Sequence, residues 1–283
     1  MRKLILTADD FGPIEGINRG VLKAVEHGKL KSVGTFVNYD NAQYVVNKNK
    51  YAFEKHKVEI GLHFTITSGN CVANKNLVQS LVQSDGSFYS LGEILTLQIK
   101  PEELLIELEA QYQKFITLFG YSPKHFSNHH GILDVVPSLY SVYLFFCAEK
   151  DIPKRSAEIF PIIQKRVYFN HLFKKLRIKR SKSFLLFLLL GNGNMARRIR
   201  NSFNIKSPDR TDARIYRFRT RLSIYFAFKN VRKNQTNEIV FHLYEGEIPQ
   251  NFDYKGVDPA YFEGRKKELR YILKSGYLDF VQR

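Results

Sequence analysis

The sequence predicts an α/β protein in which parallel strands alternate with helices, and its length suits a barrel within a single domain. Three observations support this class. Segments with the pattern of buried strands alternate with amphipathic helical segments from the first residues onward. The chain has 283 residues, and a (β/α) barrel needs about 250. Hydrophobic residues make up 44% of the chain, so a large core can form and global disorder is excluded.

The N-terminal elements follow from short apolar runs and one helical pattern. Residues 4–8 are predicted as a buried strand that a pair of acidic residues terminates. Apolar side chains at helical spacing predict a helix over 17–25, which Gly28 ends. Residues 32–37 and 58–63 are predicted as the next two strands. A long connection with turn signals is expected to follow, up to residue 98.

The clearest helix of the C-terminal part is predicted over residues 101–119. Pro101 suits the first helical position, and Gly120 suits the position after the end. Apolar residues along one face give this helix a side to bury. The remaining predicted elements are strands at residues 125–129 and 238–242, and helices at residues 137–150 and 261–275.

Positive charge is concentrated in one segment. The chain has a net charge of +17. Residues 161–235 hold 20 Lys or Arg and two acidic residues, a net of +18, and the rest of the chain carries −1. We therefore predict a neutral scaffold with a strongly basic insertion at about 161–235. The insertion either keeps the protein soluble or binds an anionic partner.

An anionic membrane surface is one partner that suits the basic insertion. The apolar stretch 184–190 has basic residues on both sides, an arrangement found at lipid interfaces and equally at the ends of buried helices. The stretch is too short to span a bilayer. These features predict a cytoplasmic protein, with a peripheral location at the inner membrane face as an extension. No nucleic-acid-binding motif is present, so nucleic acid is not expected as a partner.

The N-terminal run and the cysteines bear on where the protein is located. The apolar run after Met1 is too short for a signal peptide. Cys71 and Cys147 cannot form a disulfide framework, so reduced thiols are expected. The sequence leaves the oligomeric state open and is compatible with a homo-oligomer.

Ionisable side chains lie at the ends of four of the predicted strands. They are Asp9 and Asp10, His63, His129 with His130, and His242. In a parallel α/β barrel the carboxyl ends of all strands lie at one face, so these groups would converge there. Two carboxylates and several imidazoles can bind a divalent ion and leave an acid and a base for chemistry. Each histidine taken alone would more simply be a polar loop residue.

Three sequence blocks resemble a known family. They are residues 7–12 (TADDFG), 61–69 (GLHFTITSG) and 125–130 (HFSNHH). They are similar to the signature blocks of the YdjC-like carbohydrate deacetylases, whose best-known members remove acetyl groups from chitooligosaccharides. Residues 238–242 and 265–269 resemble a later strand and the C-terminal helix of the same family, so the resemblance extends along the chain.

The resemblance implies a distorted (β/α) TIM-like barrel and a bound divalent metal ion. Asp10, His63 and His129 would be the metal ligands, and Asp9 would be the general base. The resemblance suggests magnesium, whereas one carboxylate and two imidazoles suit zinc by ligand preference, so both ions stay open. The substrate would be an acetylated sugar or oligosaccharide that loses an N-acetyl group by hydrolysis.

The proton donor for the leaving amine is not settled by the resemblance. His130 and His242 are both candidates for this role. Arg155 follows the region of the fifth strand, and we consider it a candidate to bind substrate or to keep Asp9 ionised.

Departures from the family pattern keep other functions open. The family's third block usually has Asp where this chain has Ser127, and a second His where it has Gly131. The usual His-Pro-Gly is His242-Leu-Tyr here. The chain could therefore be a degenerate member that binds a membrane or polyanion without catalysis, or another metal-dependent hydrolase such as a phosphoesterase.

Overall fold

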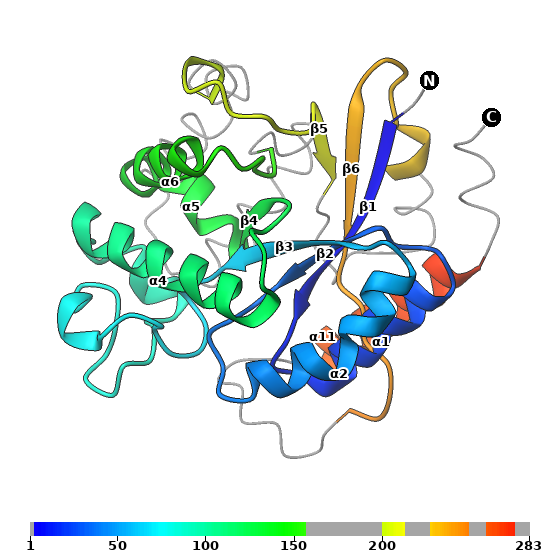
Figure 1. Ribbon diagram of the computed structural model, residues 1–283, viewed down its shortest axis with the longest axis horizontal. Coiled ribbons are helices and arrows are strands. Elements are labelled where there is room, and N and C mark those ends of the chain that lie inside the picture. Colours follow the sequence, from blue (N-terminus) through cyan, green and yellow to red (C-terminus); the bar gives the residue numbers. More distant parts are fainter. Residues whose placement is uncertain (1–2, 157–199, 213–226, 249–258, 275–283) are drawn as a thin grey trace. The chain divides into compact units, whose positions relative to one another are not determined.

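The computed structural model describes residues 3–156, 200–212, 227–248 and 259–274 (Figure 1). The chain divides into two compact units. The first comprises Met1–Thr35, Asn41–Gly61 and Pro208–Arg283, and the second comprises Phe36–Asp40 and Leu62–Ser207. Most of the basic insertion predicted at 161–235 lies outside the described residues, so its structure and the single-domain expectation stay predictions.

The strands form a six-stranded sheet in the order β4-β3-β2-β1-β6-β5. The pairings of β1 with β2 and β6, of β3 with β4, and of β5 with β6 are all parallel. Helices connect the successive strands from β1 to β4, as parallel pairing requires. The predicted α/β barrel-type class is therefore confirmed. The strands are β1 (Lys3–Phe11), β2 (Ser32–Thr35), β3 (Glu59–Phe64), β4 (Phe126–Asn128), β5 (Arg210–Asp212) and β6 (Thr236–Phe241).

Strand β1 continues past the point where the sequence predicts its end. Ala8 pairs with Val33 and Phe11 with Thr35, so β1 carries one extra residue between these pairs. This irregularity is a β-bulge, a feature that re-aims side chains. Asp10 lies in it with a φ of 66°, in the left-handed region that Asp tolerates better than most residues. The two acidic residues therefore bend the strand without ending it.

The first unit packs three helices beside its strands: α1 (Glu15–Glu26), α2 (Ala42–Lys55) and α11 (Pro259–Leu273). Helix α1 contacts β1, α2 and α11 (Figure 1). The predictions for α1 and α11 are confirmed, whereas α2 was not predicted. Its buried residues Val45, Val46, Asn49 and Phe53 follow helical spacing, so the signal was present in the sequence.

Helix α1 approaches the segment that follows β6 very closely. A Cβ added at Gly16 would lie 2.4 Å from the ring of Tyr244, and one added at Gly20 would lie 2.7 Å from the Tyr244 backbone nitrogen. Tyr244 is buried, and its hydroxyl donates a hydrogen bond to the Glu247 carbonyl at 2.8 Å. Gly16 thus leaves space for the Tyr244 ring, and Gly20 leaves space for the backbone of residues 243 and 244.

The second unit is built around α4 (Pro101–Phe119) and α6 (Pro137–Lys150), which pack on each other. Both have the bounds that the sequence predicts. Gly120 ends α4 with a φ of 79°, a left-handed conformation that glycine adopts without strain. Short helical elements that were not predicted complete this unit: η1 (Lys75–Leu77), α3 (Leu91–Ile94), η2 (His129–Gly131) and α5 (Ile132–Val135).

The connection between β3 and α4 is fastened to the inner face of α4. The carboxylate of Glu107 accepts hydrogen bonds from the backbone nitrogens of Val72 and Ala73, each at 3.0 Å. Gln111 bonds both backbone groups of Thr65. Burial raises the pKa of Glu107, and the backbone N–H donors oppose that shift. The connection predicted from turn signals is therefore an ordered structure over this helix.

Aromatic rings fill much of the second unit's core. Phe64, Phe126 and Phe146 lie in mutual contact, with ring centroids 5.1 to 5.7 Å apart.

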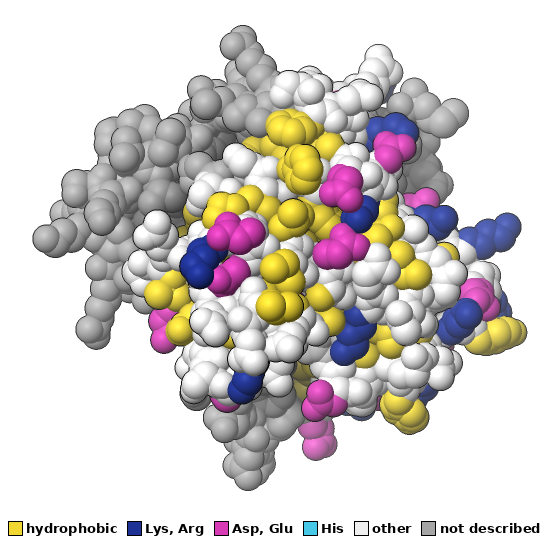
Figure 2. Space-filling model, turned by 60° about the vertical axis from the view of Figure 1, so that its left-hand side comes forward, with side chains coloured by type: hydrophobic (Ala, Val, Ile, Leu, Met, Phe, Trp, Pro, Cys, Tyr) yellow, Lys and Arg dark blue, Asp and Glu magenta, His cyan; other side chains and the backbone are white. Residues whose placement is uncertain are grey.

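Figure 2 brings the side that carries α4 and α6 forward, and hydrophobic side chains lie there among acidic and basic ones. Within the described part of the chain, no helix has the length and apolar character needed to cross a membrane.

Candidate metal centre

The first unit places two buried carboxylates at the bulge of β1. Asp9 and Asp10 are each 3% exposed. The guanidinium of Arg265 on α11 donates from Nη2 to Oδ2 of Asp10 at 2.5 Å. The turn after the bulge is held by Asn18, whose side chain bonds both the nitrogen and the carbonyl of Gly12 at 2.8 Å. Asp10 is therefore held by the Arg265 guanidinium, and the turn beside it is held by Asn18.

Helix α11 supplies two buried charged residues to this region. Arg265 also hydrogen-bonds the Tyr261 hydroxyl and lies 4.1 Å from the centre of its ring. Glu268 is fully buried and accepts a hydrogen bond from the backbone nitrogen of His242 at 2.7 Å. His242 follows β6 directly, as the sequence predicts. A carboxylate on this helix thus fixes the backbone at the end of β6.

The second unit presents His63 from β3. Its Nδ1 lies 2.7 Å from the Ser127 hydroxyl on β4, in the register where the two residues pair. The Phe36 ring lies against both His63 and His129, with centroid distances of 5.1 Å. A hydrogen bond at one ring nitrogen and an aromatic ring at the side hold His63 in one orientation, with Nε2 as its other ring nitrogen.

His129 and His130 lie in the short turn between β4 and α5. Their ring centroids are 3.8 Å apart. His130 has a φ of 57°, uncommon for a residue other than glycine, and Gly131 follows with a φ of 62°. Nδ1 of His130 lies 3.0 Å from the Thr67 hydroxyl, which belongs to the connection fastened to α4. In this turn His129 therefore lies against the Phe36 ring, whereas His130 bonds the Thr67 hydroxyl.

Three of the predicted site residues form a group able to hold a metal ion. Asp10, His63 and His129 each offer one ligand atom, and these atoms all lie within 4.8 Å of one another. Asp10 and His63 are buried, and His129 is half-buried. One carboxylate oxygen and two imidazole nitrogens form a donor set that suits zinc and similar divalent ions.

The other sequence-based site assignments have different outcomes. Asp9, His130 and His242 lie beside these ligands in the sequence or at the end of β6, and their catalytic roles stay predictions. Arg155 is half-buried, and its backbone nitrogen donates to the Phe126 carbonyl at 2.8 Å; its role toward substrate or Asp9 stays a prediction. The sequence assigns no role to Arg265, because an arginine on a predicted amphipathic helix gives no signal of its partner.

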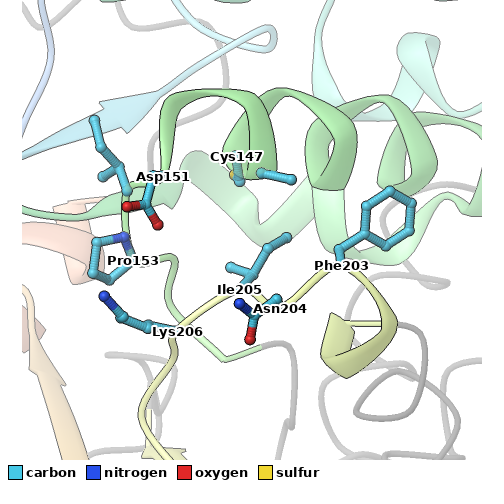
Figure 3. Close-up of a pocket in the computed structure, with 9 residues that line it drawn as sticks. Cys147, Asp151, Pro153, Phe203, Asn204, Ile205 and Lys206 are labelled. Atoms are coloured by element: carbon cyan, nitrogen blue, oxygen red, sulfur yellow. The ribbon is translucent and has the colours of Figure 1, made fainter.

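A small pocket of about 150 Å³ lies in the second unit, at the end of α6 (Figure 3). Its lining includes Cys147, Asp151, Pro153 and the segment 203–206, and none of the candidate metal ligands. Burial raises the pKa of the Cys147 thiol to about 12. Both cysteines are free thiols, as predicted. This pocket therefore shares no lining residue with the candidate metal ligands.

Comparisons with known proteins give the same family that the sequence blocks suggest. The family described as YdjC-like protein matches residues 3–283. A chitooligosaccharide deacetylase of Yersinia enterocolitica is 32% identical over 157 residues, 54% of this chain and 58% of that protein. A carbohydrate deacetylase of Clostridium beijerinckii is 31% identical over 153 residues, 54% of this chain and 59% of that protein. The matched regions thus span less than two thirds of these relatives' lengths.

A solved structure confirms the fold over nearly the whole chain. It is a proposed cellobiose-phosphate cleavage protein of Enterococcus faecalis V583, with a TM-score of 0.71 and 18% sequence identity. The match covers 99% of this chain and 94% of that one. Taken with the family match over residues 3–283, these findings show that the chain belongs to the YdjC-like family.

Proposed function

We propose that this protein is a metal-dependent hydrolase that removes an N-acetyl group from an acetylated sugar or oligosaccharide. The observation that supports this most is the group formed by Asp10, His63 and His129, whose ligand atoms lie within 4.8 Å of one another. This group occurs in a chain similar to proteins named chitooligosaccharide and carbohydrate deacetylases.

The metal ligands in this proposal are Asp10, His63 and His129. Ser127 engages Nδ1 of His63, so Nε2 would bind the ion. Arg265 engages Oδ2 of Asp10, so Oδ1 would be the ligand oxygen. When bound, zinc or magnesium would act as a Lewis acid on the acetyl carbonyl and lower the pKa of a water molecule.

The protein's own residues would move the protons of the reaction. Asp9 would accept a proton from the attacking water, which adds its oxygen to the acetyl carbon. The bond between carbon and nitrogen then breaks, and the nitrogen leaves as an amine once it gains a proton. The products are acetate and the free amino sugar, and no covalent enzyme intermediate is needed.

We assign the proton donation to His130. Its ring lies against the ring of His129, a proposed ligand, and the Thr67 hydroxyl holds its Nδ1. Its left-handed backbone conformation costs free energy, a feature common at functional sites. His242 is the alternative donor, because it follows β6 as the other histidines follow their strands.

The proposal is tested by measuring acetate released from diacetylchitobiose with added zinc or magnesium, together with phosphate release from a sugar phosphate. We expect metal-dependent acetate release by the wild type. Asp10→Ala should lose both bound metal and activity. Asp9→Asn should retain the metal and lose activity by about 10²–10⁴-fold, the range for a general base. His130→Ala and His242→Ala should separate the two candidate donors.

Three results would contradict the proposal. Acetate release without metal, or full activity in Asp10→Ala, would remove the metal from the mechanism. Phosphate release without acetate release would make the protein a phosphoesterase. Bound metal with no release from any acetylated sugar would support a binding protein that has lost catalysis.

A further inference from the structure

Lys154 is a fully buried cation in the second unit. Its side chain is 0% exposed, and its Nζ lies 2.7 Å from Oδ1 of Asp134. The rings of Tyr140 and Tyr143 on α6 lie 5.3 and 5.2 Å from the same nitrogen. A buried ammonium group is costly unless it is paired, and here one carboxylate and two aromatic faces compensate it.

The backbone around Lys154 runs alongside β4, and its hydrogen bonds fix the position of Lys154 next to that strand. Lys154 forms a parallel bridge with Phe126. The Phe126 nitrogen donates to the Pro153 carbonyl, and the Arg155 nitrogen donates to the Phe126 carbonyl, both at 2.8 Å. The Lys154 nitrogen donates in turn to the carbonyl of Lys206 at 3.1 Å. Lys154 therefore emerges from the sheet next to the strand that leads into His129.

A chain of hydrogen bonds connects Lys154 to that strand. Oδ2 of Asp134 accepts a hydrogen bond from Nδ2 of Asn128 at 2.8 Å. Oδ1 of Asn128 accepts one from the backbone nitrogen of Leu133 at 3.0 Å. Because the carboxylate accepts only, it fixes which end of the Asn128 amide donates, and the carbonyl end is left to hold Leu133.

Asn128 directly precedes His129, so these bonds close a loop around the histidine turn. The side chain of Asn128 spans from β4 to the first turn of α5, across residues 129–131. Two consecutive residues of this turn, His130 and Gly131, have positive φ. Such a turn persists only where its surroundings hold it.

We propose that Lys154 is a positioning residue for the metal centre. Through Asp134 it fixes the Asn128 side chain, and through Asn128 the turn that presents His129. The inference rests on the proposed function, since His129 is a ligand only in that proposal. If the ion pair of Lys154 and Asp134 only stabilised the fold, apolar side chains could replace it, because such a replacement is often neutral for the free energy of unfolding.

The test compares zinc affinity, measured by calorimetry, with stability toward urea in the full-length chain. The double variant Lys154→Met, Asp134→Leu removes the ion pair without leaving a buried charge. We expect it to unfold at a moderately lower urea concentration, because the Asn128 amide loses its acceptor. The folded variant should bind zinc about 10–100-fold more weakly, the range for losing the outer support of metal ligands. Hydrogen exchange of the Leu133 amide should become faster. Asn128→Ala should weaken zinc binding similarly.

Lys124→Met is the matched control, because Lys124 also lies over a tyrosine ring but is exposed. It should bind zinc like the wild type. Wild-type zinc affinity in both the double variant and Asn128→Ala would overturn the inference and leave the metal centre intact. A wild-type protein that binds neither zinc nor magnesium would overturn the metal centre and this inference with it.

Discussion

At the scale of single residues, Ser127 is the most informative departure from the family pattern. Its hydroxyl lies beside His63, and the family pattern noted in the sequence analysis has Asp at this position. A hydroxyl can still bond Nδ1 and fix the ring, at the observed 2.7 Å. It adds no negative charge, so it raises the basicity of the imidazole less than a carboxylate would. The substitution thus preserves the orientation of His63 with weaker electrostatic support.

Ser127→Ala should weaken metal binding. The variant loses the hydrogen bond that holds His63, and loss of such a partner typically costs about 10–100-fold in metal affinity. Calorimetric titration with zinc measures this directly. Ser122→Ala is the control, because it removes an exposed hydroxyl that bonds Tyr112 in the same unit. Equal zinc affinity in Ser127→Ala and the wild type would show that the hydroxyl has no such role.

At the scale of elements, α1 and the segment after β6 depend on each other. The His-Pro-Gly pattern noted in the sequence analysis has small and rigid residues after the histidine, whereas this chain has Leu243 and Tyr244. Helix α1 compensates with glycine at positions 16 and 20, where the bulky segment lies against it. Burial raises the pKa of the Tyr244 hydroxyl, as expected for a phenol packed in this contact. The segment directly after His242 therefore packs against a helix far away in the sequence.

Gly16→Ala and Gly20→Ala should both destabilise the protein, although alanine favours helix formation by about 1 kcal/mol. Each new methyl group would overlap Tyr244, and overpacking costs about 1–3 kcal/mol. Urea unfolding of single and double variants with Tyr244→Ala measures the coupling. The coupling should be large for Gly16, which meets the ring. It should be small for Gly20, which meets the backbone that Tyr244→Ala retains. Equal coupling at both positions would contradict this packing.

At the scale of the whole molecule, the basic segment and the candidate metal ligands lie in different parts of the sequence. Residues 161–235 carry a net +18, and the rest of the chain is nearly neutral. The candidate metal ligands all lie in the neutral part. A concentrated positive segment attracts anionic surfaces from a distance, without affecting the fold.

We expect the full-length protein to co-sediment with vesicles that contain phosphatidylserine, and much less with neutral vesicles. High salt should reduce the binding, because it screens the attraction. A variant with Lys174, Lys175 and Lys179 changed to glutamate should bind less while retaining the wild-type metal affinity. Equal binding to both vesicle types, or none to either, would end the membrane hypothesis.

Local patterns in the sequence were sufficient for most elements and for the candidate ligands. Pro101 and Gly120 delimit α4 because a proline can begin a helix and a glycine can end one without any tertiary partner. His63 could be selected because it ends a largely apolar run that suits a buried strand, and His129 because its block, HFSNHH, resembles a block of the family. Helix α2 has the same kind of local pattern, with buried residues at helical spacing, so the sequence alone contains enough information to predict it.

The sequence by itself thus determined the α/β class, most strand and helix positions, and the identity of Asp10, His63 and His129 as residues of interest. Only the tertiary structure decided their partners: Arg265 for Asp10, Ser127 for His63, and the chain from Lys154 to Asn128 behind His129. The physical reason is that backbone preferences act between neighbouring residues. An ion pair between residues 10 and 265 depends on how distant segments pack, which no local pattern records.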